Sequence, residues 1–341
     1  MKKKLVAILL VMTIVLSAVG CGSKTDDKKT TDSDHKLKKI TMVLDWTPNT
    51  NHTGLYVAQA NDYFKDAGLE VEIVQPPEDG AEALVASGKA QFGVSFQDSM
   101  APALTGDAAM PITAVAALIQ HNTSGIISRK GEGMNTPKGM EGKKYATWDL
   151  EVEKAMIRSV VEADGGDYQK IEMIPSTITD EISALETKSI DAVWIYYAWT
   201  GLAAKVKGLD TDYFAFRDID PVFDYYTPVV ISNNDFLKED PDTAKAFLSA
   251  LAKGYEFAMD EPNKAADILC KASPELDKDI VLESQKWLAN EYKSEVTQWG
   301  YMDAARWNSF YNWLNENKLI NPAIPENTGF TNDYLPTEDP K

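Results

Sequence analysis

Cysteine and histidine are scarce in this chain. The two cysteines are Cys21 and Cys270, and Cys21 ends a stretch that we expect to be processed. Cys270 then has no partner for an intrachain disulfide, and its helical context (AADILC) favours a small apolar role in packing. The three histidines do not form the spaced cluster that a metal site requires, so we expect neither a bound metal nor another cofactor.

Basic residues are also in deficit. Lys and Arg number 34 against 52 Asp and Glu, which gives a formal net charge of −18. Such a charge argues against non-specific binding to nucleic acid and to an anionic membrane surface. Common catalytic signatures are missing as well, since the sequence contains no GxSxG elbow, P-loop, GxGxxG or HExxH motif.

An apolar run at residues 5–19 follows three lysines near the start of the chain. The run is too short to cross a bilayer and is typical of a signal peptide. It leads into Ser17-Ala18-Val19-Gly20-Cys21, which resembles a bacterial lipoprotein cleavage site. We therefore expect a signal peptide at residues 1–20, a lipid on Cys21 and a flexible tether at residues 21–38. The alternative is an ordinary signal peptide with a chance cysteine.

Beyond the tether, strand-like runs alternate with amphipathic helical patterns, and 341 residues suit two domains. A first series has strands at 40–44, 69–74, 92–94 and 112–118, with helices at 53–67 and 80–87. A second series has strands at 144–147, 171–174, 192–195 and 213–216, with helices at 152–163, 179–188 and 198–206. This order predicts an α/β fold with two lobes, each a mostly parallel sheet flanked by helices, and a ligand cleft between them.

The remaining segments complete the two lobes. A β-rich run at 226–231 carries the chain back, and helices at 241–259 and 303–317 have no strands of their own, so they should cover the first lobe. We place lobe 1 at residues 39–128 plus 230–341, and lobe 2 at residues 129–229.

The stretch at residues 44–69, LDWTPNTNHTGLYVAQANDYFKDAGL, holds a dense group of polar and aromatic side chains between a strand and a helix. Open α/β sheets bind ligands just outside the carboxyl ends of their strands, at such a turn. Asp45, Trp46, Asn51 and His52 are therefore candidate ligand contacts, suited to a flat, nitrogen-rich molecule. Each also has a structural alternative, and Asn51 in particular could cap the helix.

This stretch resembles the opening of the solute-binding proteins that serve ABC importers of thiamine pyrimidine precursors. The segments GKAQFGVS (88–95) and DAVWIYYAWTG (191–201), and the long run at 229–269, support the resemblance, which covers residues 39–334. It implies the two-lobed type II periplasmic-binding-protein fold and no enzyme activity. It further implies a monomer outside the cell membrane that closes over a hydroxymethylpyrimidine or formylaminopyrimidine and delivers it to a permease with its ATPase.

The same fold serves a fungal pyrimidine synthase, and the sequence departs from that enzyme in three places. The turn at 95–100 has Asp98 near the place of the enzyme's donor histidine, the segment FDYYT (223–227) lacks the cysteine cluster, and WDLEVE (148–153) replaces a glycine-bearing phosphate loop. The carboxylates of that last loop disfavour a phosphate. All three departures favour binding of an uncharged or cationic ligand.

Further candidate contacts come from both lobes. The aromatic group at the end of the 192–195 strand should present at least one ring to the cleft, with Trp194 and Tyr196 on one side and Tyr197 on the other. Thr200 stands where related receptors carry an acid, and Glu151 or Glu153 could replace it. Another flat heterocycle, such as riboflavin, is the alternative ligand, and a synthase is the alternative class. The full set of additional candidates is Ser95, Gln97, Asp98, Trp148, Glu151, Glu153, Trp194, Tyr196, Tyr197, Trp199 and Tyr226.

Overall fold

The computed structural model describes residues 37–106, 109–176 and 178–337. The expected signal peptide, the lipidation site Cys21 and nearly all of the tether lie outside these residues. Within them, no helix combines the length and apolarity needed to cross a bilayer.

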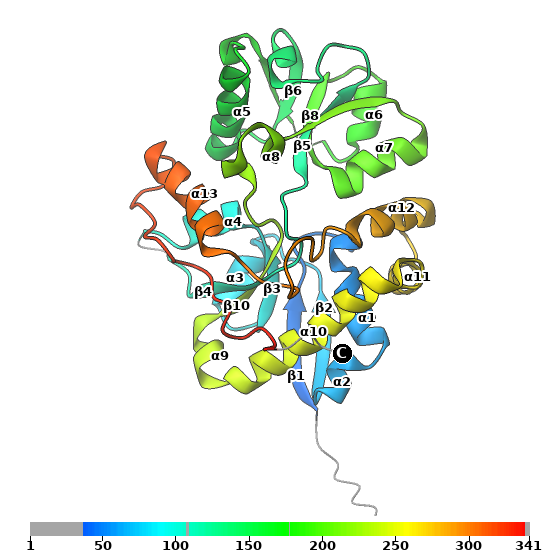
Figure 1. Ribbon diagram of the computed structural model, residues 1–341, viewed down its shortest axis with the longest axis vertical. Helices are drawn as coiled ribbons and strands as arrows, with labels where there is room; N and C mark the ends of the chain where they lie inside the picture. The colour runs from blue at the N-terminus through cyan, green and yellow to red at the C-terminus, as the bar shows by residue number, and fades with distance from the viewer. Residues whose placement is uncertain (1–36, 107–108, 177, 338–341) are drawn as a thin grey trace, which may run out of the picture. The chain divides into compact units, whose positions relative to one another are not determined.

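The first sheet has five strands in the order β2-β1-β3-β10-β4 (Figure 1). β1 pairs in parallel with β2 and β3, whereas β10 is antiparallel to both β3 and β4. Four strands therefore share one direction, as predicted, and only the returning strand opposes them. The strands are β1 (Lys38–Val43), β2 (Leu69–Val74), β3 (Phe92–Ser95), β4 (Ile112–Ala117) and β10 (Val229–Asn233).

The second sheet repeats this plan in the order β7-β6-β8-β5-β9. β5 is antiparallel to β8 and β9, and β6 is parallel to β7 and β8. The strands are β5 (Ser124–Arg129), β6 (Lys144–Thr147), β7 (Glu172–Pro175), β8 (Ala192–Tyr196) and β9 (Thr211–Ala215). The predicted fold class is confirmed.

Two segments connect the lobes, residues 118–123 before β5 and residues 224–228 before β10. The boundary predicted at residue 128 was wrong, because β5 pairs with β8 and β9 and so belongs to lobe 2. The sequence hides this, since β5 is a wholly buried run whose partners lie more than 60 positions away. The second boundary, predicted at 229, lies at the start of β10.

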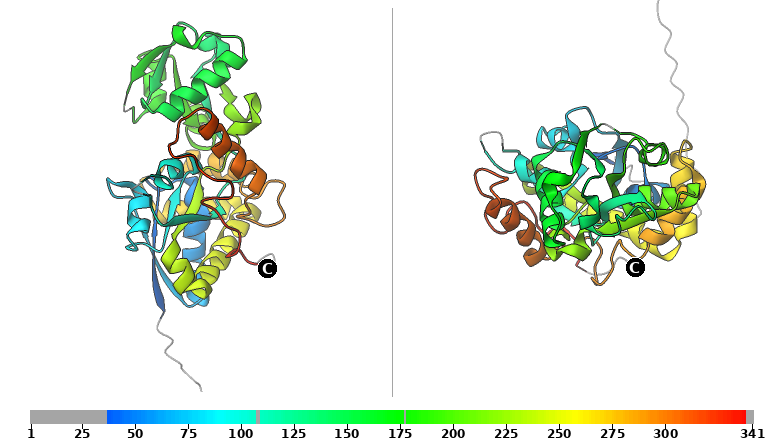
Figure 2. Two further views of the ribbon diagram at one scale, coloured as in Figure 1. Left: turned by 90° about the vertical axis from the view of Figure 1, so that its left-hand side faces the viewer. Right: turned by 90° about the horizontal axis from the view of Figure 1, so that it is seen from above.

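Helices from both ends of the chain cover the first sheet, and the longest is α10 (Figure 2, left). α1 packs closely on α10 because Gly54 and Gly254 face each other, so that a Cβ on Gly254 would come within 2.0 Å of the Gly54 oxygen. The helices of lobe 1 are α1 (Thr53–Ala60), α2 (Tyr63–Asp66), α3 (Gly80–Ala86), α4 (Gln97–Ala103), α9 (Asn234–Glu239), α10 (Pro241–Asp260), α11 (Pro262–Ala272), α12 (Lys278–Leu288) and α13 (Ala304–Glu316), with the 3-10 turn η1 (Thr50–His52).

Two predictions in this lobe need correction. The helix predicted at 53–67 is two helices, because Asp62 adopts a positive φ of 59° between α1 and α2. The polar turn expected after β3 is the helix α4, which contains Pro102.

Lobe 2 has shorter helices and 3-10 turns around its sheet. α12 of lobe 1 also reaches this lobe: Ile280 joins the apolar cluster of lobe 2, and the Ser284 hydroxyl donates to the Ala198 carbonyl. The elements are α5 (Glu151–Ala163), α6 (Glu181–Glu186), α7 (Leu202–Lys207), α8 (Phe216–Ile219), η2 (Pro137–Met140), η3 (Tyr168–Lys170), η4 (Tyr197–Gly201, a π-helical turn) and η5 (Pro221–Phe223).

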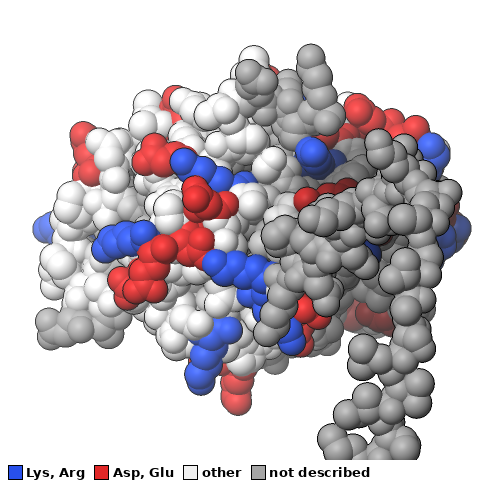
Figure 3. All heavy atoms as spheres, turned by 90° about the horizontal axis from the view of Figure 1, so that it is seen from below, with Lys and Arg blue, Asp and Glu red and all other residues white. Residues whose placement is uncertain are grey.

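One face of the described residues carries charges of both signs. On the face drawn in Figure 3, acidic and basic side chains lie interspersed. Cys270 is partly buried beside Ala266, Leu269 and Val281, which agrees with its expected packing role.

Candidate functional site

The turn after β1 is organised by a buried histidine. His52 Nε2 lies 2.6 Å from Asp45 Oδ1, and His52 Nδ1 accepts the Asn49 N–H at 3.2 Å. Since Nδ1 accepts, Nε2 carries the proton and donates it to Asp45. Both ring nitrogens are thereby occupied, so His52 positions Asp45 and has no nitrogen left for a ligand. Asn49, not Asn51, caps η1 with its side chain.

Aromatic rings from both lobes gather beside this turn. Trp46 follows Asp45 in this turn and is 65% exposed. Phe96, directly after β3, stacks against Tyr196 at the end of β8, with ring centroids 6.1 Å apart and planes 18° apart. After burial, the charges of Asp98 and Asp45 raise the pKa of Tyr196, so the three residues lie near one another. The C-terminal ends of β1 and β3 in lobe 1 and of β8 in lobe 2 therefore lie near one another here.

Asp98, in the first turn of α4, has a carboxylate oxygen that lacks a hydrogen-bond donor. Its Oδ1 is buried and has no hydrogen-bond partner in the described structure. Burial raises the pKa of Asp98 to about 6, the N–H groups of Asp98 and Ser99 lower it, and the charge of Glu82 raises it. Glu82 is itself held by the hydroxyl of Ser95, which donates to it.

Tyr225 is another buried group without a hydrogen-bond partner. Its ring stacks on Phe310 at 4.0 Å, and its hydroxyl is unbonded among the described residues. Burial and then the charges of Asp98 and Tyr196 raise the pKa of Tyr225 far above its usual range, so the hydroxyl keeps its proton. The Asn122 side chain lies near enough to lower this pKa, but no hydrogen bond to it meets the normal geometry. An unpaired donor and an unpaired acceptor thus lie near enough for the charge of Asp98 to act on Tyr225. Each leaves a cost of about 1–3 kcal/mol that a ligand could relieve.

Trp194 and Trp148 form the lobe 2 side of this region. Their rings lie 5.6 Å apart, Trp148 is 49% exposed, and the Trp194 Nε1 is buried without an acceptor. Tyr196 meets Phe96, whereas Tyr197, the first residue of η4, packs on Tyr213 and Trp287.

Several other predicted contacts are engaged in holding the fold. Glu153 accepts bonds from the Tyr145 and Thr147 hydroxyls at 2.6 and 2.9 Å and from the N–H of Trp148 at 3.2 Å. Glu151 is exposed and pairs with Lys154 at 3.1 Å. The geometry therefore assigns Glu153 to the structure of lobe 2, and neither acid supplies an unpaired buried carboxylate.

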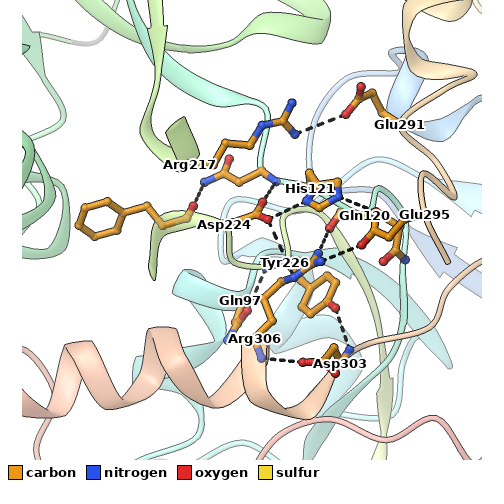
Figure 4. A network of polar contacts seen from close by, with 12 residues as sticks. Gln97, Gln120, His121, Arg217, Asp224, Tyr226, Glu291, Glu295, Asp303 and Arg306 are labelled. Carbon is orange, nitrogen blue, oxygen red and sulfur yellow. Dashed lines mark hydrogen bonds and ion pairs between the residues drawn. The ribbon is translucent and has the colours of Figure 1, made fainter. Parts of the chain in front are cut away.

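Gln97 and Tyr226 tie segments of lobe 1 together (Figure 4). The Gln97 side chain donates to the Trp307 carbonyl at 2.8 Å and accepts the Tyr226 N–H at 2.9 Å. The Tyr226 hydroxyl accepts the Asp303 N–H at 2.7 Å. Trp199 packs with the apolar clusters beneath α11 and α12. The polar atoms of Gln97 and Tyr226 are thus engaged with other parts of the protein, and Trp199 is partly buried.

Phe96 and Tyr225 are absent from the predicted contacts, although Tyr226, the neighbour of Tyr225, is among them. In the sequence, Phe96 has the features of an ordinary core residue. Its contact with lobe 2 depends on the position of Tyr196 at the end of β8. Among the described residues, no group of three or more His, Cys, Asp and Glu side chains could hold a metal ion.

Comparison with known proteins identifies the family. The family model described as NMT1/THI5 like matches residues 49–265. The chain belongs to the NMT1/THI5-like family. A formylaminopyrimidine-binding protein of Halalkalibacterium halodurans is 28% identical to it over 335 residues, covering 95% of this chain and 96% of that protein.

Other NMT1/THI5-like relatives carry a different name. A 4-amino-5-hydroxymethyl-2-methylpyrimidine phosphate synthase of Saccharomyces cerevisiae is 27% identical over 324 residues, covering 89% of each chain. Among solved structures, the periplasmic aliphatic sulphonate-binding protein of Escherichia coli superposes with a TM-score of 0.66 at 12% identity, covering 84% of this chain and 95% of that one. This last likeness shows the periplasmic-binding-protein fold.

Proposed function

We propose that this chain is the extracytoplasmic solute-binding protein of an ABC importer and captures a pyrimidine-type thiamine precursor. Its partners would be a permease and the ATPase of that permease, and a lipid on Cys21 would keep it at the outer face of the membrane. The family membership and the relative from Halalkalibacterium halodurans support the proposal. The chemical class of the ligand is inferred from the polar and aromatic groups of the candidate site.

The observation that carries the proposal is the unpaired Asp98 Oδ1 beside the unpaired Tyr225 hydroxyl. An aminopyrimidine presents an amino donor next to a ring-nitrogen acceptor along one edge. The amino group would donate to Asp98, and the ring nitrogen would accept the Tyr225 proton. One ligand edge would therefore satisfy both buried groups, which is the arrangement that confers high selectivity against analogues without it.

Aromatic groups on either side would hold the plane of the ring. Trp46 offers an exposed face from lobe 1, and the Phe96–Tyr196 pair and Trp148 offer faces from both lobes. Stacking of this kind contributes about 0.5–1.5 kcal/mol per pair beyond burial. Asp149 and Glu151, exposed at the start of α5, would repel a phosphate, so we expect the unphosphorylated precursor.

A calorimetric binding panel tests the proposal. Formylaminopyrimidine, hydroxymethylpyrimidine, thiamine and riboflavin are titrated into the protein, together with a formylaminopyrimidine analogue in which hydrogen replaces the amino group. We expect a pyrimidine to bind and the analogue to bind at least tenfold more weakly. No binding by any pyrimidine would refute the ligand assignment, and riboflavin binding would replace it.

Two variants connect the ligand to the site. Asp98→Asn and Tyr225→Phe should each weaken pyrimidine binding by about tenfold to a hundredfold, the cost of 1–3 kcal/mol for one buried partner. Glu151→Gln is the matched control, because it removes an exposed charge at the lobe 2 rim. Equal loss in all three variants would contradict the assigned roles of Asp98 and Tyr225.

A synthase activity is the second candidate, because the family includes proteins named as synthases. It predicts a pyrimidine product when the protein is incubated with pyridoxal phosphate and iron. Formation of that product would overturn the assignment as a binding protein.

A further inference from the structure

A network of charged side chains joins the two connecting segments of the lobes to the C-terminal part of lobe 1 (Figure 4). His121 belongs to the first connecting segment and Asp224 to the second. Glu295 lies in the loop between α12 and α13, and Arg306 lies on α13. None of these residues contributes to the proposed ligand site, so the network needs a separate explanation.

His121 lies between two carboxylates. Its Nδ1 is 2.6 Å from Asp224 Oδ2, and its Nε2 is 2.7 Å from Glu295 Oε2. A carboxylate only accepts hydrogen bonds, so both ring nitrogens must donate, and only the protonated imidazolium has two N–H groups. The geometry therefore describes the charged form of His121. The same arrangement raises the pKa of His121, chiefly through the bond with Asp224 and against the effect of burial.

The other charged groups around His121 define what happens when it loses its proton. Arg306 bonds Glu295 at 3.0 Å, lies 3.9 Å from Asp224, and donates to the Gln120 carbonyl at 2.6 Å. Asp224 also accepts the Asn122 N–H at 3.0 Å. Asp224 is thus held from several sides, whereas Glu295 is more than half exposed. Neutral His121 keeps one N–H, which should stay with Asp224, so the contact with Glu295 is the one that fails.

One further charged contact crosses between the lobes nearby. Arg217 on α8 lies 3.4 Å from Glu291, and the Glu291 carbonyl accepts the Gln120 N–H. Residues on both sides of the hinge are therefore linked to the segment that carries Glu295.

We propose that His121 is a pH-responsive clamp on the hinge, which ties both connecting segments to the C-terminal loop when protonated and releases Glu295 when neutral. Loss of the proton to solvent would break the contact between His121 and Glu295, while Arg306 and the Gln120 N–H still hold the 289–303 loop. The connecting segments would then be held by fewer contacts, which would widen the range of interlobe distances. This device goes beyond the proposed function and does not depend on which ligand the protein binds.

Single-molecule energy transfer tests the clamp without any ligand. Dyes are placed on Lys89→Cys in lobe 1 and Glu162→Cys in lobe 2, both exposed, in a chain with Cys21 and Cys270 replaced by Ser. We expect a narrower distribution of interlobe distances at pH 6 than at pH 9, with its midpoint at the pKa of His121 measured from the NMR titration of its ring. A distribution that is unchanged between pH 6 and pH 9 would overturn the proposal.

Two variants separate the clamp from general effects of pH. Glu295→Gln, at an exposed position that should not affect folding, should remove the pH dependence, and His121→Gln should give the broad distribution at every pH. Glu239→Gln, an exposed acid on α9, is the matched control and should behave as the unchanged chain. Persistence of the pH dependence in either His121→Gln or Glu295→Gln would refute the role of His121.

Discussion

Asp98→Asn should stabilise the ligand-free protein at neutral and alkaline pH. Burial is the main cause that raises the pKa of Asp98 from 3.8 to about 6. A raised carboxyl pKa means that the folded state disfavours the charged form, so stability falls as pH rises from about 4 through 6. The shift corresponds to roughly 3 kcal/mol, and this cost is fully present above pH 6 and absent well below pH 4.

The asparagine removes the charge but leaves a buried amide, which costs about 1 kcal/mol if it finds no partner. We therefore expect Asp98→Asn to be more stable than the unchanged protein by about 1–2 kcal/mol at pH 8, and slightly less stable at pH 4. Urea unfolding followed by tryptophan fluorescence at both pH values measures the two differences, and Glu151→Gln serves as the exposed control. A free-energy difference that is the same at pH 4 and pH 8 would refute the reasoning.

Three other substitutions have clear expected outcomes. Trp46→Ala should change the free energy of unfolding by less than about 0.5 kcal/mol, because the side chain is mostly exposed, while calorimetry shows at least a tenfold loss of pyrimidine affinity. Gly254→Ala should lower the thermal midpoint although alanine favours helices, because its Cβ would overlap the Gly54 backbone. Glu153→Gln should cost about 1–3 kcal/mol in chemical unfolding, because it alters a buried acceptor of several bonds, and a neutral effect would contradict its structural role.

The order of strands and helices could be predicted because it depends on local periodicity. β2 lies at the predicted bounds, α10 is one residue longer than predicted at its C-terminal end, and α13 is one residue shorter than predicted at each end. The lobe boundary at β5 could not be predicted, because the sequence of a fully buried strand does not indicate which of the two sheets it joins. α4 was missed for a related reason, since Ser95, Gln97 and Asp98 suggest a polar turn until the packing of Gln97 against α13 is seen.

The candidate site shows a sharper limit of the sequence. His52, Gln97, Glu153 and Tyr226 are the same kinds of residue as Asp98 and Tyr225, and some are neighbours in the chain. The first four have their polar atoms engaged with other parts of the protein, whereas the last two retain an unpaired atom. Only the folded structure distinguishes residues whose polar atoms bond to the protein from residues that keep an unpaired polar atom available to a ligand.

The second connecting segment bears on the choice between binding and catalysis. In the synthases that this chain resembles, a cysteine cluster precedes the returning strand, and here residues 223–227 take that place. Asp224 of this segment holds His121, Tyr225 carries one of the unpaired hydroxyls, and Thr227 meets Tyr196 at 3.4 Å. In the proposed function, Asp224 would serve hinge geometry and Tyr225 would serve ligand recognition. The segment would then couple lobe movement to an occupied site, as a binding protein requires.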